Sequence, residues 1–171
     1  MLPPLRPALK KALGADAPSR ARPVLVLGVG SPLRSDDAVG LHVAATLVRQ
    51  PLPYVSVIEA GPAPENFTSE IRSRRPAVLL IVDCAKMGEA PGSMKLAAPE
   101  EVAGVSFGTH GLPLSVLADY VRREVGCDVF FLCIEPASLE PGEGLSPSLR
   151  QAAAQATALL RDVLSPASFL P

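Results

Sequence analysis

The stretch Ala77-Val-Leu-Leu-Ile-Val-Asp83 decides the fold class of this 171-residue chain. Six apolar residues follow one another without alternation, a pattern typical of a strand that is buried on both faces. Residues 24–27 (Val-Leu-Val-Leu) and 128–134 (Asp-Val-Phe-Phe-Leu-Cys-Ile) predict two further strands of this kind, and residues 54–59 predict a fourth. Strands buried on both faces indicate a sheet that is covered on both sides.

Segments with helical periodicity separate these strands. The predicted helices span residues 38–50 and 65–74, and two more begin at Pro113 and Pro147. Strands that alternate with helices require right-handed crossovers between parallel strands. We therefore expect an α/β fold, a three-layer sandwich in which a mostly parallel sheet carries helices on both faces. Residues 93–97 predict a short additional strand at the sheet edge.

Composition divides the chain and excludes several classes of protein. Residues 1–23 are basic and proline-rich and predict a largely flexible extension with one short helix around residues 7–13. Residues 24–166 predict the folded domain, and residues 167–171 predict a tail. The chain has 16 basic and 17 acidic residues, so it lacks the basic surface of a nucleic-acid-binding protein. No apolar run approaches the roughly 20 residues that a membrane helix needs. Three cysteines without a CxxC pair indicate reduced thiols, and we expect a cytoplasmic protein with no membrane or nucleic-acid partner.

Three polar residues stand where the chemistry of such a sheet is expected. Asp37 follows the first strand, Asp83 ends the central one, and His110 lies in a loop before a helix. In open α/β sheets, ligands bind beyond the carboxyl ends of the strands, so these side chains can converge there. Two carboxylates and an imidazole could hold a divalent metal, or act as a general base with an orienting acid.

Each candidate also has a purely structural interpretation. Asp36 or Asp37 could cap the following helix, Asp83 could hold a turn, and His110 could be a surface residue. We interpret Cys84 as a packing residue, because a thiol beside a carboxylate forms a thiolate poorly. Gly28-Val-Gly30 is not a dinucleotide motif, since Leu33 replaces its third glycine, and the chain has no GxSxG motif.

Taken together, the motifs resemble those of the hydrogenase maturation proteases, over roughly residues 23–164. The resemblance lies in the order and spacing of short segments: residues 25–30 (Leu-Val-Leu-Gly-Val-Gly), 36–40 (Asp-Asp-Ala-Val-Gly), 79–83 (Leu-Leu-Ile-Val-Asp), 91–93 (Pro-Gly-Ser), 109–114 (Thr-His-Gly-Leu-Pro-Leu), Ile134, 138–141 (Ser-Leu-Glu-Pro) and 144–147 (Gly-Leu-Ser-Pro). It implies a twisted sheet. It also implies an endopeptidase that removes the C-terminal extension from the precursor of the large subunit of a nickel–iron hydrogenase.

The resemblance also implies roles for individual residues. Asp37, Asp83 and His110 correspond to the metal-contacting catalytic triad, while Gly30, Ser31, Asp36 and Thr109 shape the turns or contact substrate. Ser31 departs from the family's common pattern, in which asparagine is frequent at this position, and Asp37 stands where some members have glutamate.

We hypothesise that the nickel is presented by the precursor and is bound only weakly by the free enzyme, which we expect to be a monomer. Hydrolysis could be metal-assisted or carboxylate-based. The alternatives are a non-catalytic nickel-sensing docking module and a small-ligand-binding α/β domain.

Overall fold

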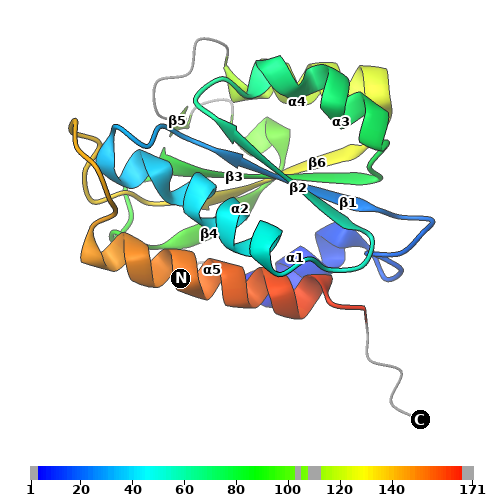
Figure 1. Ribbon diagram of the computed structural model, residues 1–171, viewed down its shortest axis with the longest axis horizontal. Coiled ribbons are helices and arrows are strands. Elements are labelled where there is room, and N and C mark those ends of the chain that lie inside the picture. The colour runs from blue at the N-terminus through cyan, green and yellow to red at the C-terminus, as the bar shows by residue number, and fades with distance from the viewer. Residues whose placement is uncertain (1–3, 103–104, 108–112, 167–171) are drawn as a thin grey trace.

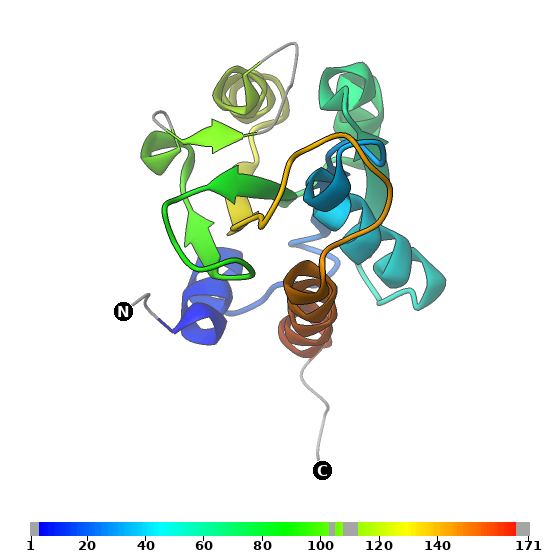
Figure 2. The same ribbon diagram turned by 90° about the vertical axis from the view of Figure 1, so that its left-hand side faces the viewer.

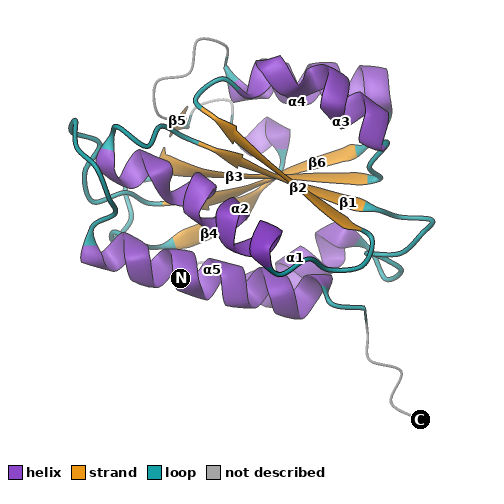
Figure 3. Ribbon diagram, in the orientation of Figure 1, coloured by secondary structure: helices purple, strands orange, loops and turns teal. Residues whose placement is uncertain are grey.

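A central sheet with helices packed on both of its faces forms the body of the molecule (Figures 1 and 3). The computed structural model describes residues 4–102, 105–107 and 113–166. Its strands are β1 (Val24–Val29), β2 (Val55–Gly61), β3 (Val78–Lys86), β4 (Met94–Ala97), β5 (Ser106–Phe107) and β6 (Asp128–Ile134). Its α-helices are α1 (Leu5–Leu13), α2 (Val39–Arg49), α3 (Thr68–Arg74), α4 (Leu114–Val125) and α5 (Pro147–Leu164). Its 3₁₀ helices are η1 (Ser35–Ala38), η2 (Pro64–Phe67) and η3 (Pro99–Glu101).

The sheet is mostly parallel, and its strands follow the order β2-β1-β3-β6-β4. Strands β2, β1, β3 and β6 run in the same direction, whereas β4 pairs antiparallel with β6 at the edge. Apolar residues of α1, α2 and α5 pack on one face, and those of α3 and α4 pack on the other. The predicted three-layer α/β fold is confirmed, as is the short edge strand near residues 93–97.

Strand β3 continues past the residue at which the sequence predicted its end. It runs on to Lys86 because Ala85 and Lys86 pair antiparallel with the two residues of β5. The sequence predicted that this strand ends at Asp83, so the pairing with β5 corrects that prediction. Asp83 is consequently fixed within a strand rather than at the start of a loop.

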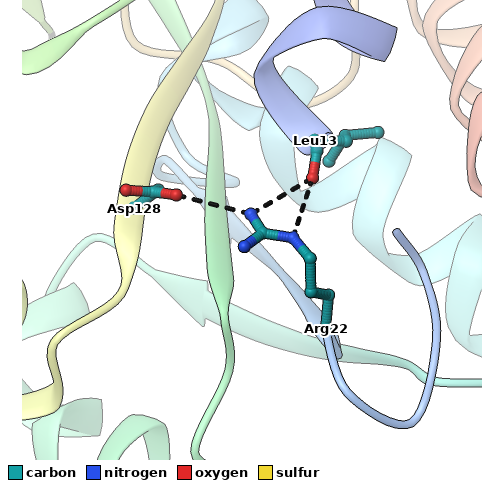
Figure 4. Close-up of polar contacts among 3 residues, drawn as sticks. All are labelled: Leu13, Arg22 and Asp128. Atoms are coloured by element: carbon teal, nitrogen blue, oxygen red, sulfur yellow. Dashed lines mark hydrogen bonds and ion pairs between the residues drawn. The ribbon is translucent and has the colours of Figure 1, made fainter. Parts of the chain in front are cut away.

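The N-terminal segment contains a helix, as the sequence predicted around residues 7–13, but this helix packs on the core instead of belonging to a flexible extension. Residues 5–13 form α1, in which Leu9 and Leu13 are 0% and 2% exposed because they pack into the core beside β4 and α5. Arg22 holds the end of this helix: its guanidinium donates to the Leu13 carbonyl and to Asp128 Oδ2 at the start of β6, 3.4 Å away (Figure 4). The basic, proline-rich segment therefore contains a helix with an apolar face that packs on the core.

The carboxyl ends of the parallel strands lie on the side of the molecule that faces the viewer in Figure 2. There the chain between β6 and α5 arches close to the turn that precedes α2. None of the helices in the described ranges combines the length and the apolar character needed to cross a membrane.

Candidate active site

Asp37 lies in η1, in the connection between β1 and α2. The turn depends on Gly30, which has a φ of 135° and lies so close to η1 that a Cβ there would be 1.7 Å from the Asp37 carbonyl oxygen. The Asp37 side chain is 1% exposed. Its Oδ2 accepts the Ser31 N–H at 2.9 Å, and its Oδ1 accepts the Cys84 thiol at 3.1 Å. Both oxygens of the carboxylate are thus held by donors from different parts of the chain.

Asp83 lies on β3, in register with Cys133 of β6, and is 1% exposed. Its Oδ1 accepts the backbone N–H of Cys84 at 2.8 Å. One oxygen from each of Asp37 and Asp83 and the Cys84 sulfur lie within 4.8 Å of one another. The structure therefore brings together the two aspartates that the sequence placed at the carboxyl edge of the sheet.

Cys84 is part of this cluster rather than a packing residue alone. Burial raises the pKa of its thiol well above the usual value, and the neighbouring carboxylates of Asp83 and Asp37 raise it further. The thiol is therefore neutral and acts as a hydrogen-bond donor to Asp37. The expectation of a poor thiolate is confirmed, whereas its contact with Asp37 had no signal in the sequence.

Asp36, next in the chain to Asp37, has a different task. Its Oδ2 accepts the N–H groups of Ala137 and Ser138 and the Ser146 hydroxyl, and its Oδ1 accepts the Ser146 N–H at 2.7 Å. The buried carboxylate thereby fixes the loop between β6 and α5. The prediction that Asp36 or Asp37 caps the following helix is wrong, because neither η1 nor α2 has a side-chain cap.

Glu135 is a second buried carboxylate that holds a turn, and sequence reasoning missed it. It is buried, and its Oε2 accepts the N–H of Met87 at 2.6 Å and that of Glu89 at 3.3 Å. This carboxylate therefore orders the turn after β3. The only signal in the sequence was an acidic residue at the end of an apolar strand.

Gly40 was also missed as a functional residue, although it sets the distance between α2 and the sheet. A Cβ at this position would lie 2.2 Å from the Val82 carbonyl oxygen and 2.4 Å from that of Val29. Only glycine allows the start of α2 to lie against β1 and β3 so closely. Because η1 leads directly into α2, this contact fixes how near Asp37 lies to β3.

His110 and Thr109, the two other residues singled out from the sequence, lie outside the described residues. Among the described residues, the cluster offers two carboxylates, whose oxygens can bind a divalent metal, beside a neutral thiol that donates to Asp37. A carboxylate at this edge can also act as a general base toward water. The positions of Asp37 and Asp83 are thus compatible with both of the chemical roles that the sequence left open.

Comparisons with known proteins identify the family. The sequence profile of the hydrogenase maturation proteases matches residues 41–162, a span that includes Asp83 and His110 and begins shortly after Asp37. The hydrogenase 3 maturation protease of Escherichia coli K12 is 37% identical over 113 residues, which cover 66% of this chain and 72% of that protein. The hydrogenase 2 maturation protease of the same strain is 30% identical over 133 residues, 74% of this chain and 80% of that protein.

A solved structure shows the same architecture. The crystal structure of the NiFe hydrogenase maturation protease HycI from Thermococcus kodakarensis KOD1 superposes with a TM-score of 0.76 at 29% identity. The match covers 83% of this chain and 92% of that structure. This chain therefore belongs to the hydrogenase maturation protease family and is a peptide hydrolase.

Proposed function

We propose that this protein is the endopeptidase that removes the C-terminal extension from the precursor of the large subunit of a nickel–iron hydrogenase after nickel insertion. The observation that carries this proposal is the pair of buried carboxylates, Asp37 and Asp83, at the carboxyl edge of the sheet. Family membership supports a peptide hydrolase, and the names of the relatives point to a hydrogenase as its substrate.

In this proposal the nickel belongs to the precursor and serves for recognition. Asp37 and Asp83 supply oxygen ligands and His110 supplies an imidazole nitrogen, a set that nickel accepts. Two carboxylates within 4.8 Å of each other also favour a divalent cation by their charge. A precursor without nickel would lack this attraction and would not dock productively.

The chemical step needs a water molecule and a base. An aspartate carboxylate can take the proton from water as it attacks the scissile carbonyl, and a metal bound nearby can polarise that carbonyl. The tight turn at Gly30 and the hydrogen bonds to Asp37 hold the carboxylate still, so little reorganisation is needed when the substrate binds.

A cleavage assay read by intact mass spectrometry tests the proposal. The large-subunit precursor, with and without nickel, is incubated with the wild-type protein and with the variants Asp37→Asn, Asp83→Asn and His110→Ala. Loss of a C-terminal peptide is expected only with wild-type protein and nickel-loaded precursor. Nickel-dependent binding of the cognate precursor without any loss of mass would identify a docking module instead.

The nickel hypothesis has a test of its own. Isothermal titration of the free protein with Ni²⁺ should show weak binding, because in this proposal the substrate carries the metal. Nanomolar affinity in the free protein would contradict recognition through substrate-borne nickel. We further propose that the protein acts as a monomer in the cytoplasm, which size-exclusion chromatography and cell fractionation can check.

A further inference from the structure

Cys84 contacts both aspartates of the site through two different groups. Its backbone N–H donates to Asp83 Oδ1 at 2.8 Å, and its thiol donates to Asp37 Oδ1 at 3.1 Å. Asp37 comes from η1 and Asp83 from β3, so the two carboxylates lie on separate elements. Among the described residues, Cys84 is the one that hydrogen bonds to both of them.

The position of the sulfur is fixed by its surroundings. Successive side chains of a strand point to opposite faces, and Cys84 packs with the core formed by α1, α2 and α5. Its side chain is fully buried, and the close contact of Gly40 with Val82 leaves α2 no room to approach further. These contacts therefore fix the distance between the Cys84 thiol and the Asp37 carboxylate.

The hydrogen bond from Cys84 complements the one from Ser31. The Ser31 N–H holds Oδ2 of Asp37 while the thiol holds Oδ1, so the plane of the carboxylate is defined by two donors on different oxygens. Without the thiol, one oxygen would lose its donor and the side chain could rotate about its terminal torsion, which is a soft one.

We propose that Cys84 is a positioning residue whose thiol orients the Asp37 carboxylate relative to Asp83 for the reaction. This inference rests on the proposed function, in which Asp37 is part of the active site. The thiol acts here as a neutral donor and is neither a nucleophile nor a metal ligand.

Three variants separate this role from simple packing. Cys84→Ala removes the donor, Cys84→Ser keeps a hydroxyl donor, and Cys133→Ala deletes the same atom from an equally buried cysteine on the neighbouring strand. Because a hydrogen bond to a charged acceptor is lost, we expect Cys84→Ala to lower kcat/KM for the nickel-loaded precursor about tenfold. Cys84→Ser should recover most of this loss, and Cys133→Ala should process the precursor at nearly the wild-type rate.

Several outcomes would overturn the inference. Unchanged processing by Cys84→Ala would show that the hydrogen bond is not needed. Equal reductions of kcat/KM in Cys84→Ala and Cys133→Ala, with matching shifts in melting temperature, would show a packing effect. Equal reductions of kcat/KM in Cys84→Ser and Cys84→Ala would show that sulfur itself is required, as for a metal ligand.

A second measurement needs no substrate and stays valid if the proposed function fails. The infrared S–H stretching band of Cys84 is identified by its absence in Cys84→Ala. If the thiol donates to Asp37, this band moves to higher frequency in Asp37→Ala, because the acceptor is gone. A band that stays in place would refute the contact on which the inference depends, whereas a wild-type protein that cleaves no precursor would refute only the function.

Discussion

Removal of the Asp36 carboxylate should destabilise the protein more than removal of an exposed carboxylate from the loop that Asp36 binds. Three backbone N–H groups and one hydroxyl donate to this fully buried side chain, and all four belong to residues 137–146. The variant Asp36→Ala leaves these donors without their acceptor. Asp36→Asn keeps one oxygen but turns an NH₂ group toward at least one N–H donor.

The size of the effect follows from the number and kind of bonds. A hydrogen bond to a charged group contributes about 1.5–3 kcal/mol, and bonds to one carboxylate do not add in full. Ala137 is exposed and Ser138 and Ser146 are half-buried, so water can replace part of what is lost. We therefore expect the free energy of unfolding to fall by about 4 kcal/mol in Asp36→Ala and about 2 kcal/mol in Asp36→Asn.

Urea unfolding followed by circular dichroism measures both values. Glu143→Ala is the matched control, because it removes an exposed carboxylate from the same loop and should change stability by less than about 0.5 kcal/mol. A loss below about 1 kcal/mol in Asp36→Ala would refute the reasoning, since it would mean that the four hydrogen bonds contribute no more than one ordinary bond.

Three further predictions follow from packing and from the buried thiols. Leu9→Ala should lower the free energy of unfolding by about 2–4 kcal/mol, because Leu9 is part of the core; unchanged stability in urea would mean that α1 is a loose extension after all. Gly40→Ala should lower the free energy of unfolding by about 3 kcal/mol or more, because the added Cβ would overlap two carbonyl oxygens. A soluble variant with the wild-type melting temperature would contradict the close approach of α2. Burial raises the pKa of Cys133 from 9.0 to about 12. In this range the unfolded chain loses the thiol proton first, so stability should fall with rising pH above about 9, by up to about 1.4 kcal/mol per pH unit. Urea titrations at several pH values should show a shallower decline for Cys133→Ala than for the wild-type protein.

The strands could be predicted because burial on both faces requires a continuous run of apolar residues, which is visible in the sequence. Residues 77–82 are continuously apolar, and a run this short between Pro76 and Asp83 is typical of a buried strand rather than of a helix. The pairing of Ala85 and Lys86 with β5 has no such pattern in the sequence, because it depends on a partner some twenty residues further along the chain. The packing of Leu9 and Leu13 likewise depends on surfaces that β4 and α5 provide.

The candidate site was predictable to the extent that it follows from strand direction. Parallel strands end at one edge, so Asp37 and Asp83 were expected to converge, and the structure brings them together. Their roles in catalysis stay a prediction, as does that of His110. The contacts of Cys84, Asp36 and Glu135 could not be predicted, since each carboxylate or thiol meets groups that only the folded chain brings near.

The adjacency of Asp36 and Asp37 has a consequence for local unfolding. Asp36 binds the loop of residues 137–146 and Asp37 accepts the Ser31 N–H, so both sets of hydrogen bonds depend on the single turn of η1. Opening of that turn must release the loop and the site in one cooperative event. The amide protons of Ser31, Ala137 and Ser146 should then exchange with solvent deuterium at rates governed by one shared opening free energy, although they lie far apart in the chain.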